Sequence, residues 1–272
     1  MTIRSYAFRN GKRKGERANV WPAVSASEGS DAGKSRWLVA SGFMLMSTIA
    51  LPASAQTGAG AAEEVAADVH LDERDTYRLE LLRMRGHLGI ARALIQQEAP
   101  GAEYHVEALQ GVVRSAEATL EDRDAPITEE TLRELENAAT LDPDQALPTL
   151  ESAVHAINGS FAQTGALDSG SVLGLTEALL REAVANYTEA VTENEVVDVR
   201  KYQTGRGLVT QAEALVRHSG ALQGQPGHEE LLKVVTVIRQ AWPGLMPPPI
   251  AFDPASIARR LDEAVAAMEK LR

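Results

Sequence analysis

Apolar residues recur every three or four positions along almost the whole chain beyond residue 70. This spacing places them on one face of an α-helix, whereas a half-buried strand would need strict alternation, which no segment shows convincingly. The first such segment carries the stripe Tyr77, Leu81, Met84, Leu88, Ala91 and Ile95. The spacing therefore predicts an all-α protein, a helical bundle of about eight helices that occupies residues 71–272.

Turn and capping residues divide this pattern into the expected helices. Pro100-Gly101, residues 168–171 and residues 220–227 interrupt it. Asp253-Pro254 is typical of a helix start, with a cap followed by proline at the first position. We expect helices at about 73–97, 102–121, 128 onward, 144–163, 171 onward, 198 onward, after 227 and from 254.

The segment before the last expected helix is rich in proline. Pro243 and the run Pro247–Pro249 restrict the backbone on either side of Leu245 and Met246. We therefore expect a stiff loop there, with Trp242 packed against the bundle.

A basic region, an apolar run and a small-residue site follow one another at the start of the chain. The apolar run, residues 37–51, precedes Ala53-Ser54-Ala55. This order is typical of a secretory signal peptide, which the sequence predicts over residues 1–55 with cleavage after Ala55. The run is shorter than the ~20 residues that span a bilayer, which disfavours the alternative of an uncleaved anchor. Residues 56–70, rich in Ala and Gly, are expected to form a flexible lead-in.

The chain beyond the expected signal is acidic and the whole sequence lacks cysteine. Residues 1–55 hold eight of the 27 Lys and Arg and three of the 38 Asp and Glu, which leaves 19 basic against 35 acidic residues, a formal charge of −16. Such a surface repels phosphate backbones and anionic lipids. We therefore expect a periplasmic protein that binds no nucleic acid and is not stably inserted in a membrane.

Two segments of the chain match each other at a nearly constant offset of 121 to 123 residues. The informative matches pair Arg85-Gly86 with Arg206-Gly207, and His105-x-Glu107 with His228-x-Glu230. Self-similarity of this kind predicts repeated halves, 71–164 and 168–272, in which the two glycines mark a close approach of helices. Chance agreement between amphipathic helices is the alternative.

The repeated His-x-Glu pairs are candidate metal ligands: His105, Glu107, His228 and Glu230. Imidazole and carboxylate groups together suit a divalent transition metal such as copper, zinc or ferrous iron. A two-fold axis along the bundle would bring both pairs to one end, whereas an axis across the bundle would place them at opposite ends. Acidic residues in the first turn of a helix also stabilise its dipole, so solvated capping is the alternative.

His87 is a further candidate ligand, at the edge of the first apolar stripe. If the following turn centres near Pro100, His87 and His105 lie about 12 Å apart along the helix axes, which argues against a shared site. A histidine satisfied by a neighbouring backbone or carboxylate group is then the alternative. The zinc-protease motif that His228-Glu229 would begin is excluded, because Leu232 stands at its second histidine position.

One segment resembles part of a known family. In order it holds Leu179-Leu180, Tyr187, Ala190-Val191, Glu195-Val196-Val197 and Lys201-Tyr202-Gln203. This order is similar to the periplasmic helical extension of bacterial high-affinity iron permeases, over about 30 of the 272 residues. The resemblance implies a helical fold and a setting of metal uptake, but no ligand set. The sequence lacks the membrane helices and acidic iron motifs of the permeases, and the Gly-x-His-x-x-Glu motif of imelysin-like proteins.

Two functions from different classes follow from these observations. The first is an exported accessory of metal uptake, which binds iron or copper and presents it to a membrane transporter or envelope protein. The second is a metal-free helical adaptor of the cell envelope. The sequence has no combination of nucleophile and base, no phosphate loop and no dinucleotide fingerprint, so we do not expect an enzyme.

Overall fold

A computed structural model describes residues 69–121, 134, 137 and 142–272. These described residues form seven α-helices and one short β-hairpin, so the predicted all-α class is confirmed. The elements are α2 (Glu73–Gln96), α3 (Ala102–Glu121), α5 (Pro143–Gln163), α6 (Ser169–Ala190), β1 (Val191–Thr192), β2 (Glu195–Val196), α7 (Val199–His218), α8 (His228–Arg239) and α9 (Pro254–Glu269). None of the described helices is long and apolar enough to span a bilayer.

Aspartates begin four of the helices that the spacing predicted. The side chain of Asp72 accepts from the backbone N–H of Asp75, and Asp168, Asp198 and Asp253 cap α6, α7 and α9 in the same manner. Each cap satisfies backbone donors that the first turn of a helix leaves unpaired. Local sequence therefore sets where these helices begin.

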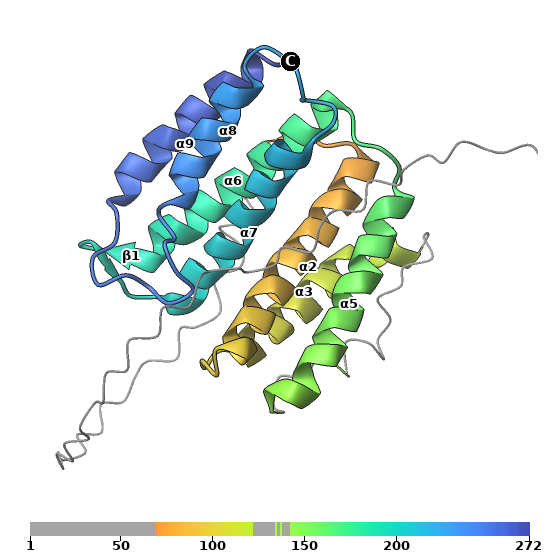
Figure 1. Ribbon diagram of the computed structural model, residues 1–272, viewed down its shortest axis with the longest axis vertical. Helices are drawn as coiled ribbons and strands as arrows, with labels where there is room; N and C mark the ends of the chain where they lie inside the picture. Colours follow the sequence, from red (N-terminus) through yellow and green to blue (C-terminus); the bar gives the residue numbers. More distant parts are fainter. Residues whose placement is uncertain (1–68, 122–133, 135–136, 138–141) are drawn as a thin grey trace, which may run out of the picture. The chain divides into compact units, whose positions relative to one another are not determined.

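The helices pack in two connected groups (Figure 1). Helices α6, α7, α8 and α9 form a closed ring of contacts, each touching the next and α9 returning to α6. Helix α2 packs against α7 and α6, with α3 and α5 beside it. The helix expected from Thr128, with Leu132 and Leu135, lies outside the described residues, as do the expected signal peptide and most of the lead-in.

The predicted apolar stripes face the interior. Every residue of the α2 stripe is buried, from Tyr77 to Ile95. Trp242 is fully buried, as expected, and its Nε1 donates to the carbonyl of Tyr202 at 2.8 Å. Its ring meets that of Tyr187 edge-on, with centroids 4.9 Å apart. The loop after α8 is therefore held against the α6–α7 pair by an aromatic cluster.

Helices α2 and α7 cross at the two glycines that the sequence comparison matched. A Cβ atom added to Gly207 would lie 2.9 Å from the carbonyl oxygen of Gly86. A Cβ added to Gly86 would lie 3.3 Å from the carbonyl carbon of Gly207. The predicted close approach is confirmed: a side chain at Gly207 would clash with the backbone of α2, and one at Gly86 would crowd that of α7. The repeat of whole halves stays a prediction.

The β-hairpin between α6 and α7 was not expected. Val191 pairs with Val196 and Thr192 with Glu195, in antiparallel register. The connecting residues Glu193 and Asn194 have φ of 52° and 64°, as a type I′ turn requires. Strands of two residues are too short to show the alternation by which a sequence reveals a strand.

Candidate metal centre

Two of the predicted candidate ligands meet between α2 and α3. Nδ1 of His87 lies 3.2 Å from Nδ1 of His105, and the ring centroids are 5.4 Å apart. His105 is fully buried and His87 is partly buried. We call these two residues the histidine pair.

The expected axial separation of about 12 Å between these histidines was wrong, because the chain begins to reverse before Pro100. It reverses earlier: Glu98 adopts φ 52°, and the N–H of Ala99 bonds to the carbonyl of Leu94. This is the Schellman arrangement, in which a left-handed residue ends the helix and folds the chain back over its last turn. A Cβ atom added to Gly101 would lie 3.9 Å from Cδ1 of Leu94, so the chain has already folded back onto α2 where α3 begins, and His105 can meet His87.

Gln203, on the first turns of α7, fixes the orientation of His105. Nε2 of His105 lies 3.2 Å from the side-chain oxygen of Gln203, which is 2 % exposed. Because an amide oxygen only accepts, His105 carries its proton on Nε2. A neutral ring then presents an unprotonated Nδ1 to His87, and the hydrogen bond between the rings requires a proton on Nδ1 of His87.

Both imidazoles are neutral over the ordinary pH range. Burial, the neighbouring His105 and the charge of Arg83 lower the pKa of His87 to about 3. Burial likewise lowers the pKa of His105 to about 4, outweighing the hydrogen bond to Gln203, which raises it. Neutral imidazole is the form that binds metal ions, and His87 offers Nδ1 to an ion once its single proton is carried on Nε2 instead of Nδ1.

A charged group lies beside the pair on the α6 side. Arg83 donates to Glu80 at 2.6 Å and to Glu182 of α6 at 2.8 Å. Burial alone would lower the pKa of Arg83, but the carboxylates of Glu182 and Glu80 outweigh it and raise that pKa. The three side chains together carry a formal charge of −1, which offsets the repulsion that Arg83 alone would exert on a cation near His87.

The other predicted ligands lie elsewhere. Nε2 of His228 donates to the carbonyl of Val216, near the end of α7. Val216 lies thirteen residues beyond Gln203, the α7 residue that accepts from His105. Thirteen residues of helix span about 20 Å, so the two His-x-Glu pairs are not brought to one site. Glu107 is exposed on α3.

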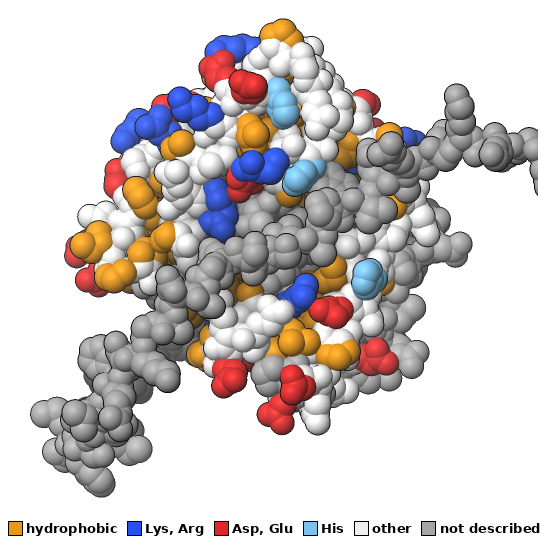
Figure 2. All heavy atoms as spheres, in the orientation of Figure 1, with side chains coloured by type: hydrophobic (Ala, Val, Ile, Leu, Met, Phe, Trp, Pro, Cys, Tyr) orange, Lys and Arg blue, Asp and Glu red, His pale blue; other side chains and the backbone are white. Residues whose placement is uncertain are grey.

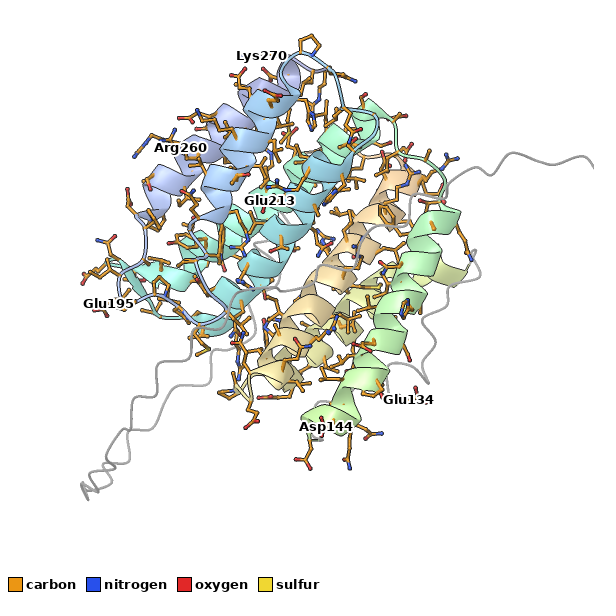
Figure 3. All side chains as sticks on the ribbon, in the orientation of Figure 1. Glu134, Asp144, Glu195, Glu213, Arg260 and Lys270 are labelled. Carbon is orange, nitrogen blue, oxygen red and sulfur yellow. The ribbon has the colours of Figure 1, made fainter. Side chains whose placement is uncertain are left out.

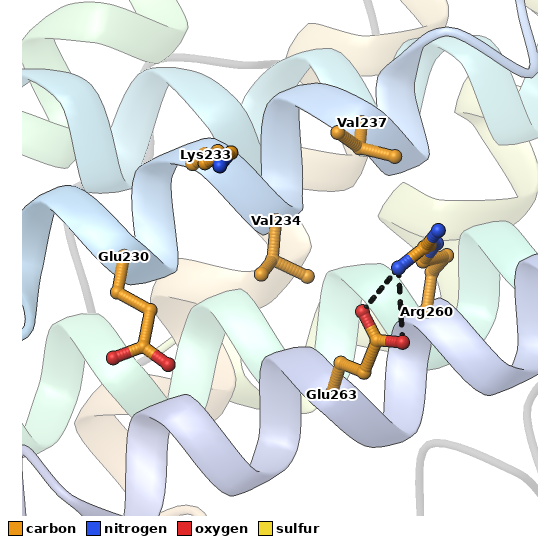
Figure 4. A pocket seen from close by; sticks show the side chains of 6 residues that line it. All are labelled: Glu230, Lys233, Val234, Val237, Arg260 and Glu263. Atoms are coloured by element: carbon orange, nitrogen blue, oxygen red, sulfur yellow. Dashed lines mark hydrogen bonds and ion pairs between the residues drawn. The ribbon is translucent and has the colours of Figure 1, made fainter.

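Glu230 faces the cleft between α8 and α9. This cleft has a volume of about 230 Å³ and is lined by Glu230, Lys233, Val234, Val237, Arg260 and Glu263 (Figure 4). The carboxylate of Glu230 lies 3.0 Å from Nζ of Lys270. Figure 3 shows Lys270 at one end of the α6–α9 group and Glu195 of the hairpin at the other. Because Gln203 belongs to the hairpin end of α7, Glu230 cannot complete the site at the histidine pair.

The remaining described histidines add nothing to the pair. His70, His155 and His218 are exposed, before α2, on α5 and on α7 respectively, and the histidines visible on the face in Figure 2 lie apart from one another. Among the residues that the structure describes, no three His, Asp or Glu side chains gather as a metal-binding group. The histidine pair therefore offers two protein ligands, and other positions of a bound ion would fall to water or an incoming group.

Sequence reasoning missed Gln203 and the Arg83–Glu182 ion pair. Both act across helices: Gln203 reaches from α7 to α3, and Arg83 from α2 to α6. Spacing within one helix carries no signal for such contacts.

Comparison of the chain with protein-family models, with curated proteins and with solved structures gives no match.

Proposed function

We propose that this protein is an exported accessory of metal uptake, which binds a transition-metal ion at the histidine pair and presents it to a membrane transporter or envelope protein. The observation that carries the proposal is the 3.2 Å approach of two neutral imidazole nitrogens, His87 Nδ1 and His105 Nδ1. The signal-like residues 1–55, the acidic composition and the resemblance to permease extensions support the cellular setting.

The experiment is a comparison of cells that carry and lack the gene under metal limitation. Total copper, zinc and iron are measured by mass spectrometry in the wild type, in the deletion strain and in a strain complemented with His87→Ala. The proposal expects a deficit of at least one metal in the deletion strain that the wild-type gene restores and the His87→Ala gene does not. Equal metal contents in all strains would reject it.

A second candidate, the metal-free adaptor, is favoured by a separate observation. Exposed large apolar side chains gather around the β-hairpin and the loop after α8: Val197, Val199, Met246, Ile250 and Phe252. Ile250 is 77 % exposed and Val197 63 %. The N–H of Ala251 bonds to the carbonyl of Asn194, which ties that loop to the hairpin turn. We call this surface the apolar end; such patches typically mark interaction sites.

The adaptor is tested by a photo-crosslinking residue placed at Ile250, with the same residue at the exposed Lys233 on α8 as control. The adaptor would be favoured over metal uptake by two results together. Ile250 alone gives an adduct of one reproducible mass, and the metal content of the cells is independent of the gene. Crosslinking of both positions to the same species would argue against a specific surface.

A further inference from the structure

The spacing of the histidine pair matches that of two adjacent ligands on one metal ion. Metal–nitrogen bonds of about 2.0–2.1 Å place two ligand nitrogens about 3.3 Å apart in a tetrahedral site and about 2.9 Å apart at a right angle. The observed Nδ1–Nδ1 distance of 3.2 Å lies between these values. An ion that takes the place of the Nδ1 proton of His87, with that proton moved to Nε2 of the same ring, would therefore need little movement of either helix.

Gln203 provides the supporting contact that metal-binding histidines usually have. Such histidines donate their second ring N–H to a carbonyl or carboxylate oxygen, which fixes the ring and directs the other nitrogen at the metal. His105 donates Nε2–H to the buried amide oxygen of Gln203 and so directs the lone pair of Nδ1 toward His87. Gln203 is thus a positioning residue rather than a ligand.

The charges around the histidine pair allow a cation to bind there with moderate affinity. Arg83 is neutralised by Glu80 and Glu182. Arg200 lies over the ring of Tyr104, 5.0 Å from its centroid, and its charge opposes a cation near His105. Glu103, in the same turn of α3 as His105, partly offsets the charge of Arg200.

The donor set distinguishes among transition metals. The pair supplies two imidazole nitrogens, the described residues add no third His, Asp or Glu, and the sequence contains no cysteine. The affinity of nitrogen ligands is highest for copper(II), lower for zinc and lower again for ferrous iron. We propose that Nδ1 of His87 and Nδ1 of His105 bind copper(II), with zinc second, while Gln203 holds His105 in place and exchangeable ligands complete the ion's coordination.

This inference rests on the proposed function, because it names the metal and the ligand atoms of the same site. It is tested by titrating copper(II), zinc and, without oxygen, ferrous iron into the protein produced from its full coding sequence and purified without a histidine tag. His87→Ala removes a partly buried ligand, Gln203→Leu removes the positioning contact, and His155→Ala is the matched control, an exposed histidine on α5. Helical dichroism establishes that each variant is folded.

We expect copper(II) to bind most tightly and ferrous iron most weakly. Gln203→Leu is expected to weaken copper binding by about 10- to 100-fold, as loss of a supporting contact does elsewhere. His87→Ala should weaken it by more, and His155→Ala should leave it unchanged. Electron paramagnetic resonance of the copper-loaded wild type should show coupling to two nitrogens, which needs no variant to fold.

The contrary outcomes separate this inference from the function on which it rests. Iron binding tighter than zinc, copper coupled to fewer than two nitrogens, or copper binding that neither His87→Ala nor Gln203→Leu weakens would each overturn the inference and leave a metal-uptake role standing. The absence of binding by any of the three ions would overturn both.

Discussion

The crossing of α2 and α7 makes a quantitative prediction for Gly207→Ala. The added Cβ would lie 2.9 Å from the carbonyl oxygen of Gly86 and 3.0 Å from its carbonyl carbon. Both are backbone atoms of α2, which cannot rotate away as a side chain could, so the two helices must move apart. Forcing an extra carbon into a packed contact costs about 1–3 kcal/mol.

Gly89→Ala on α2 is the matched control, because a Cβ there meets no atom within 4 Å. Replacing glycine by alanine inside a helix stabilises it by about 1 kcal/mol, and this gain is common to both variants. The difference between their free energies of unfolding therefore isolates the steric term. We expect Gly207→Ala to be less stable than Gly89→Ala by about 1–3 kcal/mol.

Urea unfolding followed by far-ultraviolet dichroism measures this difference. Because Gly86 immediately precedes His87, a displaced crossing should also weaken metal binding by the histidine pair. Equal stabilisation by the two substitutions would show that α2 and α7 do not approach at these glycines, and would refute the packing on which the candidate site depends.

N-terminal sequencing of protein recovered from the periplasm should begin at Gln56, because Ala53-Ser54-Ala55 follows the apolar run; full-length chain in the membrane fraction would contradict this. Trp242, the only tryptophan after that cleavage, should emit at short wavelength and shift on unfolding, since its ring is fully buried; emission like free tryptophan in the native state would contradict its packing. Burial lowers the pKa of His87 to about 3 and of His105 to about 4, below the unfolded value of about 6.5. Between the folded and unfolded pKa values, the unfolded chain binds more protons than the folded protein does. The free energy of unfolding should therefore fall as pH drops from about 6.5 to about 4. Urea unfolding at several pH values measures this fall, and His87→Gln should make it smaller. A fall of the same size in the variant would refute the titration of His87.

Much of the fold could be predicted because its determinants are local. Spacing of three and four placed the buried faces, and aspartates such as Asp168 and Asp253 marked the helix starts. These signals depend on residues within one or two turns of each other, which a single sequence displays directly.

The two misjudged connections share a physical cause. Glu98 after α2, and Glu193 and Asn194 in the hairpin, adopt positive φ where glycine usually stands. The expected bounds of about 73–97 and 102–121 agree with α2 and α3, but a glutamate gives no warning of a left-handed residue, so the turn was centred at Pro100 rather than at Glu98. The predicted distance between His87 and His105 failed for that reason.

The candidate site could be predicted only in part. His87 and His105 were recognised as ligand types, but their partners were chosen from a repeated spacing rather than from proximity. Helix α7 separates the two His-x-Glu pairs, with Gln203 near its start and Val216 near its end. Only the packing of α2, α3 and α7 shows that the histidines meet each other instead.

Anomalous diffraction from copper-loaded crystals would show whether one metal ion binds between His87 and His105. We expect an anomalous peak about 2.0–2.1 Å from Nδ1 of each histidine, with Nε2 of His105 still bonded to Gln203. An ion bound only elsewhere, with the two Nδ1 atoms still sharing a proton at 3.2 Å, would contradict it.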